Sequence, residues 1–434
     1  MEEVSPLSRP KGSLIALFAA WKGFLLAVAL GAGALGRDYD TSTSLFFDRV
    51  YGSQTRVPAP AAALTKWDAL YFMHFARAGY VYEQEWAFSA AMPLLARGIT
   101  SLFLFTSSGH DVAWEPVFAI AIAHISHLVA VLALHRLTMI MCGDARLAFV
   151  ASALHIVSPA GVFLSAPYSE SPFAALSYTG TVLFALGIKH KRNWFKRAAG
   201  VIGAGVLLGL ATAFRSNGLS NGLLFAAGAL SCLLLFARGP GMSRLLALVA
   251  PVVGGLCVAA GSVIPQALAW KRYCRDLPAG LEPRPWCNSM MPGIYTFVQS
   301  EYWNVGFLRY WTINQIPLFL LASPMLVILI VSGFAVLRDP TSGIKSLKAG
   351  PGQDYRIFAR ALAASQTLVA LLAITNYHVQ VITRLSSGYP VWYWWVAGCL
   401  MDEKRQSWGR AIVIFMVMYA GIQGVLFASF LPPA

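Results

Sequence analysis

Long apolar runs recur along the whole chain and constrain its fold more than any other feature of the sequence. A helix that crosses a bilayer needs about 20 mostly apolar residues. Only 12% of the residues are charged, whereas soluble domains carry about 25%. The sequence therefore predicts an all-α polytopic membrane protein that forms a single integral domain over residues 1–434. We expect eleven spanning helices, at 13–35, 116–138, 147–165, 171–188, 198–214, 219–236, 245–269, 312–337, 359–376, 389–401 and 411–430.

Several expected spans contain residues that predict how the span packs or where it lies in the membrane. Lys22 lies inside the first span, so its ammonium group must reach the interface or face the helix bundle. The Gly-rich segment 200–209 lies within another span, and we interpret it as a place where two helices approach closely. The span 389–401 is short and aromatic. The polar segment Met1–Gly12 precedes the first apolar run and indicates a retained signal anchor.

The distribution of charge predicts how the chain is oriented. The net charge is +14, but the basic residues cluster in short loops between apolar runs, which is typical of membrane topology rather than nucleic-acid binding. Lys and Arg outnumber acids in one set of alternate loops and are balanced by acids in the other. We therefore expect a cytosolic N-terminus. Five segments should then share the opposite face: the long loops 36–115 and 270–311, the turns 165–172 and 215–218, and the stretch 376–390.

The first long loop concentrates acidic residues. Eight of the 19 carboxylates lie between Asp38 and Glu115. We therefore expect the site of any chemistry on this face of the molecule. Apolar residues at helical spacing predict an interfacial amphipathic helix near the start of its densest part. Leu70, Phe72 and Met73 should lie against lipid in this helix, while Asp68 and His74 face water.

Asp68 is the leading candidate for chemistry. A carboxylate beside the membrane could accept a proton from a substrate hydroxyl as a general base. Alternatively, Asp68 or Thr65 could open the helix as an N-cap, because both side chains accept hydrogen bonds from free helical N–H groups. The residues alone leave both interpretations open.

Arg215 and Arg384 follow apolar runs on the expected non-cytosolic face, where cations need a partner. A guanidinium binds phosphate oxygens bidentately, but each arginine could instead form an ion pair with Glu170 or extend toward the interface. Glu170 could orient a sugar hydroxyl or cap the helix that follows.

Other residue patterns admit both a functional and a structural interpretation. His124 and His127 are spaced for metal binding on one helix, yet packed and hydrogen-bonded imidazoles are the more common case. The aromatic residues of the first loop could stack on sugars or form an interfacial belt. Among the six cysteines, only Cys274 and Cys287 share a polar loop, where they could form a disulfide in an oxidising compartment or remain two thiols.

Four ordered motifs resemble the PIG-V family of GPI mannosyltransferases, most of all its fungal members. They are KWDALYF (66–72) with GYVYEQEWAF (79–88), SPAGVFLSAPYSESPF (158–173), FRSNG (214–218) and RLSSGYPVWYW (384–394). The resemblance spans the chain. The segment SAAMP (89–93) departs from it, where a turn of the Phe/Ser-Pro-Gly type is expected.

This resemblance implies a GT-C type glycosyltransferase of the endoplasmic reticulum membrane with a luminal active site. Such an enzyme takes mannose from dolichyl-phosphate-mannose and adds the second, α1,6-linked mannose to a mannosylated glucosaminyl-phosphatidylinositol acceptor. A small membrane partner subunit is expected. Inversion with Asp68 as base fits the resemblance, and no metal or other cofactor is expected. The expected substrate-binding residues are Trp67, His74, Glu85, Tyr168, Glu170, Arg215, Asn217 and Arg384.

Three other functions compete with this hypothesis. One is another glycosyltransferase that uses the same donor with a different acceptor. A transporter or lipid flippase would need charges at the midplane and interrupted helices in matching halves, whereas this chain places its acids in a loop. A non-catalytic partner subunit would not need Asp68 and Arg215 together.

Overall fold

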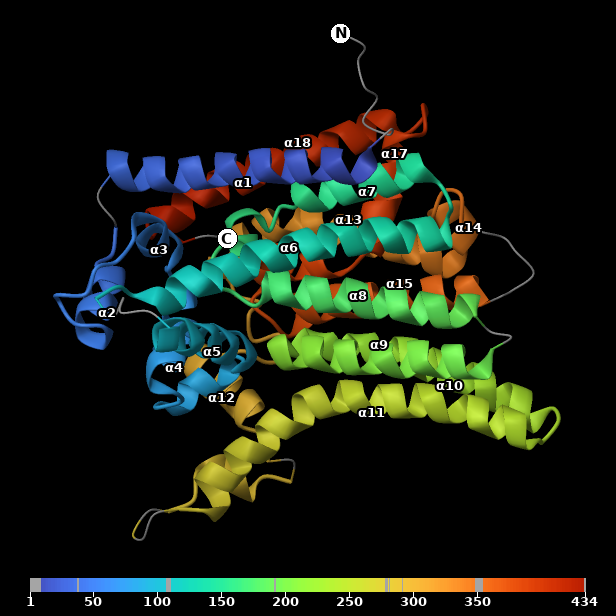
Figure 1. The fold of residues 1–434 in the computed structure, drawn as a ribbon, viewed down its shortest axis with the longest axis horizontal. Coiled ribbons are helices and arrows are strands. Elements are labelled where there is room, and N and C mark those ends of the chain that lie inside the picture. The colour runs from blue at the N-terminus through green and yellow to red at the C-terminus, as the bar shows by residue number, and fades with distance from the viewer. Residues whose placement is uncertain are drawn as a thin grey trace.

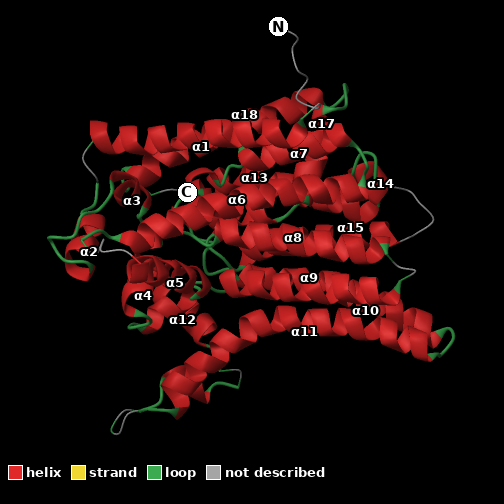
Figure 2. Ribbon diagram, in the orientation of Figure 1, coloured by secondary structure: helices red, strands yellow, loops and turns green. Residues whose placement is uncertain are grey.

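The computed structural model describes residues 9–36, 39–106, 111–190, 193–277, 280, 282–290, 292–347 and 354–432. These residues form a helical bundle with irregular connections and no named strand (Figures 1 and 2). Nine helices in the described part are long and apolar enough to cross a membrane, which confirms a polytopic membrane protein. They are α1 (Pro10–Leu35), α6 (Trp114–Met141), α8 (Glu170–Lys189), α9 (Trp194–Phe214), α10 (Gly222–Ala237), α11 (Met242–Trp270), α13 (Ile316–Arg338), α15 (Asp354–Thr375) and α18 (Gln406–Ala428). The helix α10 reaches this length only together with the 3₁₀ turn before it, as the span Ser216–Ala237.

Two of the eleven expected spans are wrong, because the helices at these positions are too short to cross a membrane. In place of 147–165, α7 (Ala145–Ile156) ends early, since Pro159 disfavours helical backbone in the residue before it and Gly161 takes a left-handed conformation. In place of 389–401, α17 (Val391–Leu400) has only ten residues. Both are apolar because they are buried within the bundle, where they pack against each other, rather than exposed to lipid.

The irregular segment after α7 is stabilised by Lys22 of α1. The Lys22 ammonium donates hydrogen bonds to the Leu164 carbonyl oxygen and the Ser165 hydroxyl, both at 2.8 Å. The Ser171 hydroxyl donates to the same carbonyl at 2.9 Å. Non-helical backbone at membrane depth requires such internal partners. Lys22 therefore faces the bundle, one of the two placements expected from the sequence.

The glycines of α9 bring two helices into backbone contact. A Cβ atom added to Gly205 would lie 2.3 Å from the Cα atom of Gly254 on α11, and one added to Gly209 would lie 2.3 Å from the Cys257 carbonyl oxygen. This contact confirms the close approach predicted for segment 200–209.

Short helices gather at one end of the bundle (Figure 1). They are α2 (Ser42–Val50), α3 (Ala59–Leu64), α4 (Ala69–Ala78), α5 (Ala91–Thr106) and α12 (Ile294–Trp303). The five segments expected on the non-cytosolic face all connect helices at this end, and the basic loops connect them at the other. The side of the membrane that each end occupies stays a prediction. The remaining short helices, α14 (Pro340–Gly343) and α16 (Ile382–Leu385), belong to connections.

The predicted helix near Asp68 exists as α4, but its apolar face does not meet lipid. Phe72 and Met73 are buried in a cluster with Met92 of α5 and Tyr168. The amphipathic pattern is the same for a helix on lipid and a helix on protein, so the sequence did not distinguish them. The helix α5 of this region exposes four apolar residues, Leu94, Leu95, Leu102 and Phe105.

Substitution of Gly209 by Ala should destabilise the protein, because the new methyl group forces α9 away from α11. We expect a loss of about 1–3 kcal/mol, typical of overpacking, measured as a lower midpoint of thermal unfolding in detergent. The matched control is Gly23→Ala on α1, where a Cβ meets no atom within 4 Å. Equal midpoints for the two variants would show that the α9–α11 contact is not tight.

Candidate active site

Four segments far apart in the sequence meet in one chain of ion pairs at the end that carries the short helices. The Glu170 atom Oε1 forms an ion pair with Arg215 Nη1 at 2.5 Å and accepts a hydrogen bond from Arg384 Nε at 2.7 Å. Arg384 also donates through Nη1 to Asp68 Oδ2 at 3.1 Å. The structure thus brings together Asp68, Glu170, Arg215 and Arg384, and the ion pairs that the sequence left as an alternative for the arginines are present.

Exposure separates the roles of the two carboxylates. The Glu170 side chain is 1% exposed, and the Arg384 and Arg215 side chains are 14% and 19% exposed. The Asp68 side chain is 37% exposed. Within this cluster, Asp68 is therefore the carboxylate that a ligand can reach, and Glu170 holds the two guanidinium groups from behind.

Asp68 occupies the N-cap position of α4 but makes no capping hydrogen bond with its side chain. Its carboxylate points to Arg384 instead. The preceding residue, Trp67, has φ +56°, a left-handed conformation that is costly for a bulky side chain. The alternative in which the Asp68 side chain serves as an N-cap is therefore wrong, and local strain accompanies the orientation of this carboxylate toward the ion pairs.

Aromatic rings support Arg384. Its guanidinium carbon lies 4.4 Å from the ring centre of Phe163 and 4.8 Å from that of Tyr168, distances at which a cation is attracted to the ring face. The Tyr168 side chain is fully buried, and its hydroxyl donates to the Lys66 carbonyl oxygen at 3.1 Å. Tyr168 thus supports both Arg384 and the backbone next to Trp67 rather than facing the open side of the site.

A polar network extends from Arg215 into the bundle. Arg215 Nε donates to the Asn217 amide oxygen at 3.3 Å, and the Asn217 amide nitrogen donates to the Tyr389 hydroxyl at 2.9 Å. That hydroxyl also lies 3.0 Å from the Ser220 hydroxyl. The sequence prediction did not include Tyr389 as a site residue, although it belongs to the fourth motif.

His74 and Glu85 form a pair of their own in the first loop. His74 Nδ1 contacts Glu85 Oε1, and Glu85 Oε2 accepts hydrogen bonds from the backbone N–H groups of Val81 and Tyr82 at 2.7 and 2.9 Å. Glu85 is 1% exposed. Its position is that of a buried side chain that orders the loop and orients His74, rather than one that faces the open side of the site.

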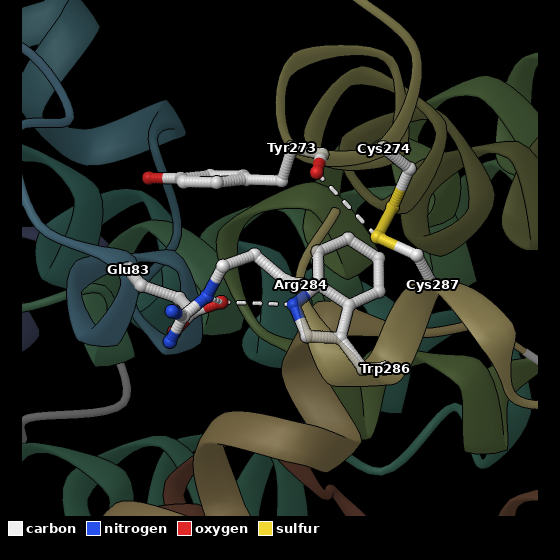
Figure 3. Close-up of a disulfide and its surroundings, with 6 residues drawn as sticks. All are labelled: Glu83, Tyr273, Cys274, Arg284, Trp286 and Cys287. Atoms are coloured by element: carbon white, nitrogen blue, oxygen red, sulfur yellow. Dashed lines mark hydrogen bonds and ion pairs between the residues drawn. A yellow bond between two sulfur atoms is a disulfide. The ribbon is translucent and has the colours of Figure 1, made fainter. Parts of the chain in front are cut away.

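Glu83 joins the first long loop to the second (Figure 3). Its carboxylate accepts hydrogen bonds from the Arg284 guanidinium at 2.6 and 3.0 Å, from Trp286 Nε1 at 2.8 Å and from the Tyr302 hydroxyl at 3.2 Å. We call Glu83, Arg284, Trp286 and Tyr302 the loop clamp. Burial opposes ionisation of Glu83, but the hydrogen bonds outweigh it and hold the pKa of this carboxyl below its ordinary value.

A disulfide stabilises the second long loop next to the loop clamp. Cys274 and Cys287 are bonded, with their Cα atoms 5.6 Å apart (Figure 3). The structure thus selects the disulfide from the two alternatives that the sequence left open. Cys287 directly follows Trp286, so the bond restrains the segment that reaches Glu83.

The remaining candidates have structural partners. His124 Nδ1 lies 2.8 Å from the Ile120 carbonyl oxygen, and His127 Nε2 lies 3.3 Å from that of His155. Tyr71 stacks on Phe88, and Tyr80 stacks on Trp86. These contacts match the structural interpretations of both patterns. Trp67 packs against Phe430 with ring centres 4.8 Å apart.

Comparisons with known proteins give a consistent result. The profile of a family described as mannosyltransferase (PIG-V) matches residues 38–434. The chain is 56% identical to GPI mannosyltransferase 2 of Gibberella zeae, covering 98% of both chains. It is 33% identical to GPI alpha-1,6-mannosyltransferase 2 of Cricetulus griseus, covering 79% of this chain and 74% of that protein.

Among solved structures, the chain resembles an oligosaccharyltransferase of Archaeoglobus fulgidus at a TM-score of 0.41 and 14% sequence identity. The match covers 80% of this chain and 45% of that chain, so it spans under half the length of the solved protein.

Substitution of Glu83 by Gln should weaken the loop clamp in a pH-dependent way. Because the folded-state pKa is lowered, the stabilisation is present above the ordinary glutamate pKa of about 4.3 and is lost as pH falls through the lower folded-state value. At pH 7 we expect the variant to lose about 1–3 kcal/mol. The difference in thermal midpoint from the unmodified protein should shrink below about pH 4.

The control for this experiment is Glu301→Gln, at an exposed position of α12 next to Tyr302. It should leave the midpoint unchanged at both pH values. A Glu83→Gln difference that does not vary with pH would contradict an ionised clamp.

Proposed function

The chain belongs to the mannosyltransferase (PIG-V) family and is a membrane glycosyltransferase, and we propose that it moves mannose from dolichyl-phosphate-mannose to a GPI-anchor precursor. The names of its relatives support a GPI precursor and an α1,6 linkage. We propose a mannosylated glucosaminyl-phosphatidylinositol acceptor, which receives its second mannose in this reaction. We place the reaction in the endoplasmic reticulum, with a cytosolic N-terminus and a luminal active site. A GT-C type fold and a small membrane partner subunit are part of the same proposal.

One observation carries the proposed mechanism: the accessible Asp68 carboxylate pairs with Arg384, and the buried Glu170 holds Arg384 together with a second guanidinium, Arg215. Mannosyl transfer from a lipid phosphate needs a group that accepts a proton and groups that stabilise a developing phosphate charge. Both kinds of group lie in this cluster.

In the proposed step, the 6-hydroxyl oxygen of the acceptor mannose bonds to the anomeric carbon of the donor from the side opposite the phosphate. The bond from that carbon to the phosphate oxygen breaks, and its electron pair leaves with dolichyl phosphate. Asp68 takes the hydroxyl proton. Attack from the opposite side inverts the configuration at the anomeric carbon.

Of the two arginines, Arg215 is the better candidate for direct phosphate contact. Arg384 is shared between two carboxylates and rests on two rings, whereas Arg215 pairs with one carboxylate. Arg384 would then mainly position Asp68. Because guanidinium groups can stabilise a phosphate monoester as it leaves, this chemistry does not require a metal, and we propose no cofactor.

Substitution of Asp68 by Asn tests the base. The amide keeps an oxygen that can accept from Arg384 but cannot take up the proton, so transfer should fall by about 10²–10⁴-fold. The assay uses membranes, dolichyl-phosphate-mannose and a one-mannose GPI precursor. Asp48→Asn, at an exposed position of α2 in the same loop, should keep full activity.

Full transfer by Asp68→Asn would remove this residue as the base. Transfer by the unmodified protein to an N-glycan precursor, and not to the GPI precursor, would instead overturn the acceptor and leave the donor chemistry in place.

Substitution of the arginines separates their roles. Arg215→Ala should raise KM for dolichyl-phosphate-mannose or lower kcat, by about 10²-fold in kcat/KM, because the leaving phosphate loses a partner. Arg384→Ala should lower kcat and also the thermal midpoint, since the buried negative charge of Glu170 loses one of its two cationic partners. Arg49→Ala on α2, an exposed position, is the control. Unchanged kinetics in Arg215→Ala would exclude it from the phosphate site.

A further inference from the structure

A cavity lies between α8, α9, α10, α11 and α15, away from the Asp68 site. It is a partly open space, and its volume of about 650 Å³ includes the part open to the surroundings. Its walls are mostly apolar and include Phe184, Val201, Leu224 and Phe358. Among the described residues that line it, Arg197 alone is charged.

The cavity extends along α10. The residues of α10 that line it run from Leu224 to Cys232, a rise of about 12 Å at 1.5 Å per residue. Arg197 lies in the first turn of α9, so it marks one end of the cavity. A partly open apolar groove of this length along α10, with a cation at one end, matches part of an acyl chain that carries a charged headgroup.

Arg197 has few hydrogen-bond partners for a part-buried guanidinium. In the described part of the chain, Arg197 Nη2 donates a hydrogen bond to the Cys232 sulfur at 3.5 Å. A guanidinium has five N–H donors, and a thiol sulfur is a weak acceptor. The cavity therefore presents unused donors beside apolar walls.

The depth of Arg197 matches that of lipid headgroups. Trp194 and Phe195, at the start of α9, are 71% and 67% exposed, and exposed aromatic residues at helix ends mark the membrane–water interface. Arg197 lies about one turn deeper than Trp194. At this depth a phosphate group of the adjacent leaflet can reach the guanidinium.

The surrounding charge favours an anionic lipid. The ends of the five helices at this side of the bundle carry one acid, Asp354, and many cations. These cations are Lys189, Lys196, Arg197, Arg238, Arg244, Arg356 and Arg360. Clusters of this kind attract anionic headgroups, since each cation near a charged leaflet adds attraction.

We propose that this cavity binds one anionic phospholipid, with its phosphate on Arg197 and an acyl chain between α9 and α10. The site lies at the opposite end of the bundle from Asp68 and is independent of mannosyl transfer. Bound lipid stabilises the folded protein, because a ligand that binds only the folded state raises the unfolding midpoint.

The test uses the full chain in a nonionic detergent and phosphatidylserine as the probe. Thermal unfolding is followed as lipid is titrated, and native mass spectrometry counts bound lipid. We expect one tightly bound phosphatidylserine and a raised midpoint. Arg197→Gln should weaken the apparent affinity at least tenfold, and Gly228→Phe should abolish binding by filling the cavity.

Two variants serve as matched controls. A Cβ atom at Gly228 would meet Pro251 and Phe184 at 3.5 and 3.6 Å, which are ordinary contacts, so Gly228→Ala should fold and bind normally. Lys404→Gln removes an exposed cation between α17 and α18, outside the five helices of the cavity, and should also keep binding.

Three results would overturn the proposal. Equal affinity in Arg197→Gln would remove the phosphate contact, and equal binding of phosphatidylcholine would remove the anionic preference. The same rise in midpoint with inorganic phosphate alone would show a site for a free anion rather than a lipid. Because Arg197→Gln suffices for the decision, a folding failure of Gly228→Phe leaves the test intact.

Discussion

The structure around the site depends on a single buried carboxylate. Glu170 is nearly inaccessible, and its charge is compensated by Arg215 and Arg384. Removal of one partner from such a cluster leaves an uncompensated buried charge, which is strongly destabilising. The two arginines are thereby tied to the start of α8, and through Arg384 the first long loop is tied to the bundle at Asp68. One electrostatic requirement thus brings four distant segments to one place.

Interrupted helices make room for this cluster inside an apolar protein. The segment after α7 and the turns before α17 leave backbone groups that lipid cannot satisfy. Side chains satisfy them: Lys22 and Ser171 bond the first segment, and Tyr178 donates to the Ser387 carbonyl oxygen at 2.6 Å in the second. The apolar and aromatic character of both short helices reflects burial within the protein. It is the reason that sequence alone counted them as complete spans.

The sequence predicted most residues of the site but fewer of the contacts between them. Asp68, Glu170, Arg215 and Arg384 were predictable, because charged residues at the ends of apolar runs need a partner or a ligand. The sequence did not predict the roles of Tyr389 and Glu83, whose partners lie about 172 to 219 residues away. It also placed the apolar face of α4 against lipid, since amphipathic spacing identifies a buried face but not the material that buries it.

By itself, the sequence determined the class of the protein, the grouping of its loops at two ends and the motifs that mark its family, since these follow from composition, from the alternation of apolar runs and from local residue order. Only the tertiary structure decided which residues meet. It showed that Glu170 is a buried anchor and Asp68 the accessible carboxylate, that Glu85 orders the first loop, and that Cys274 and Cys287 form a bond. The physical reason is that burial and ion pairing depend on distances between segments, and no local pattern of residues encodes those distances.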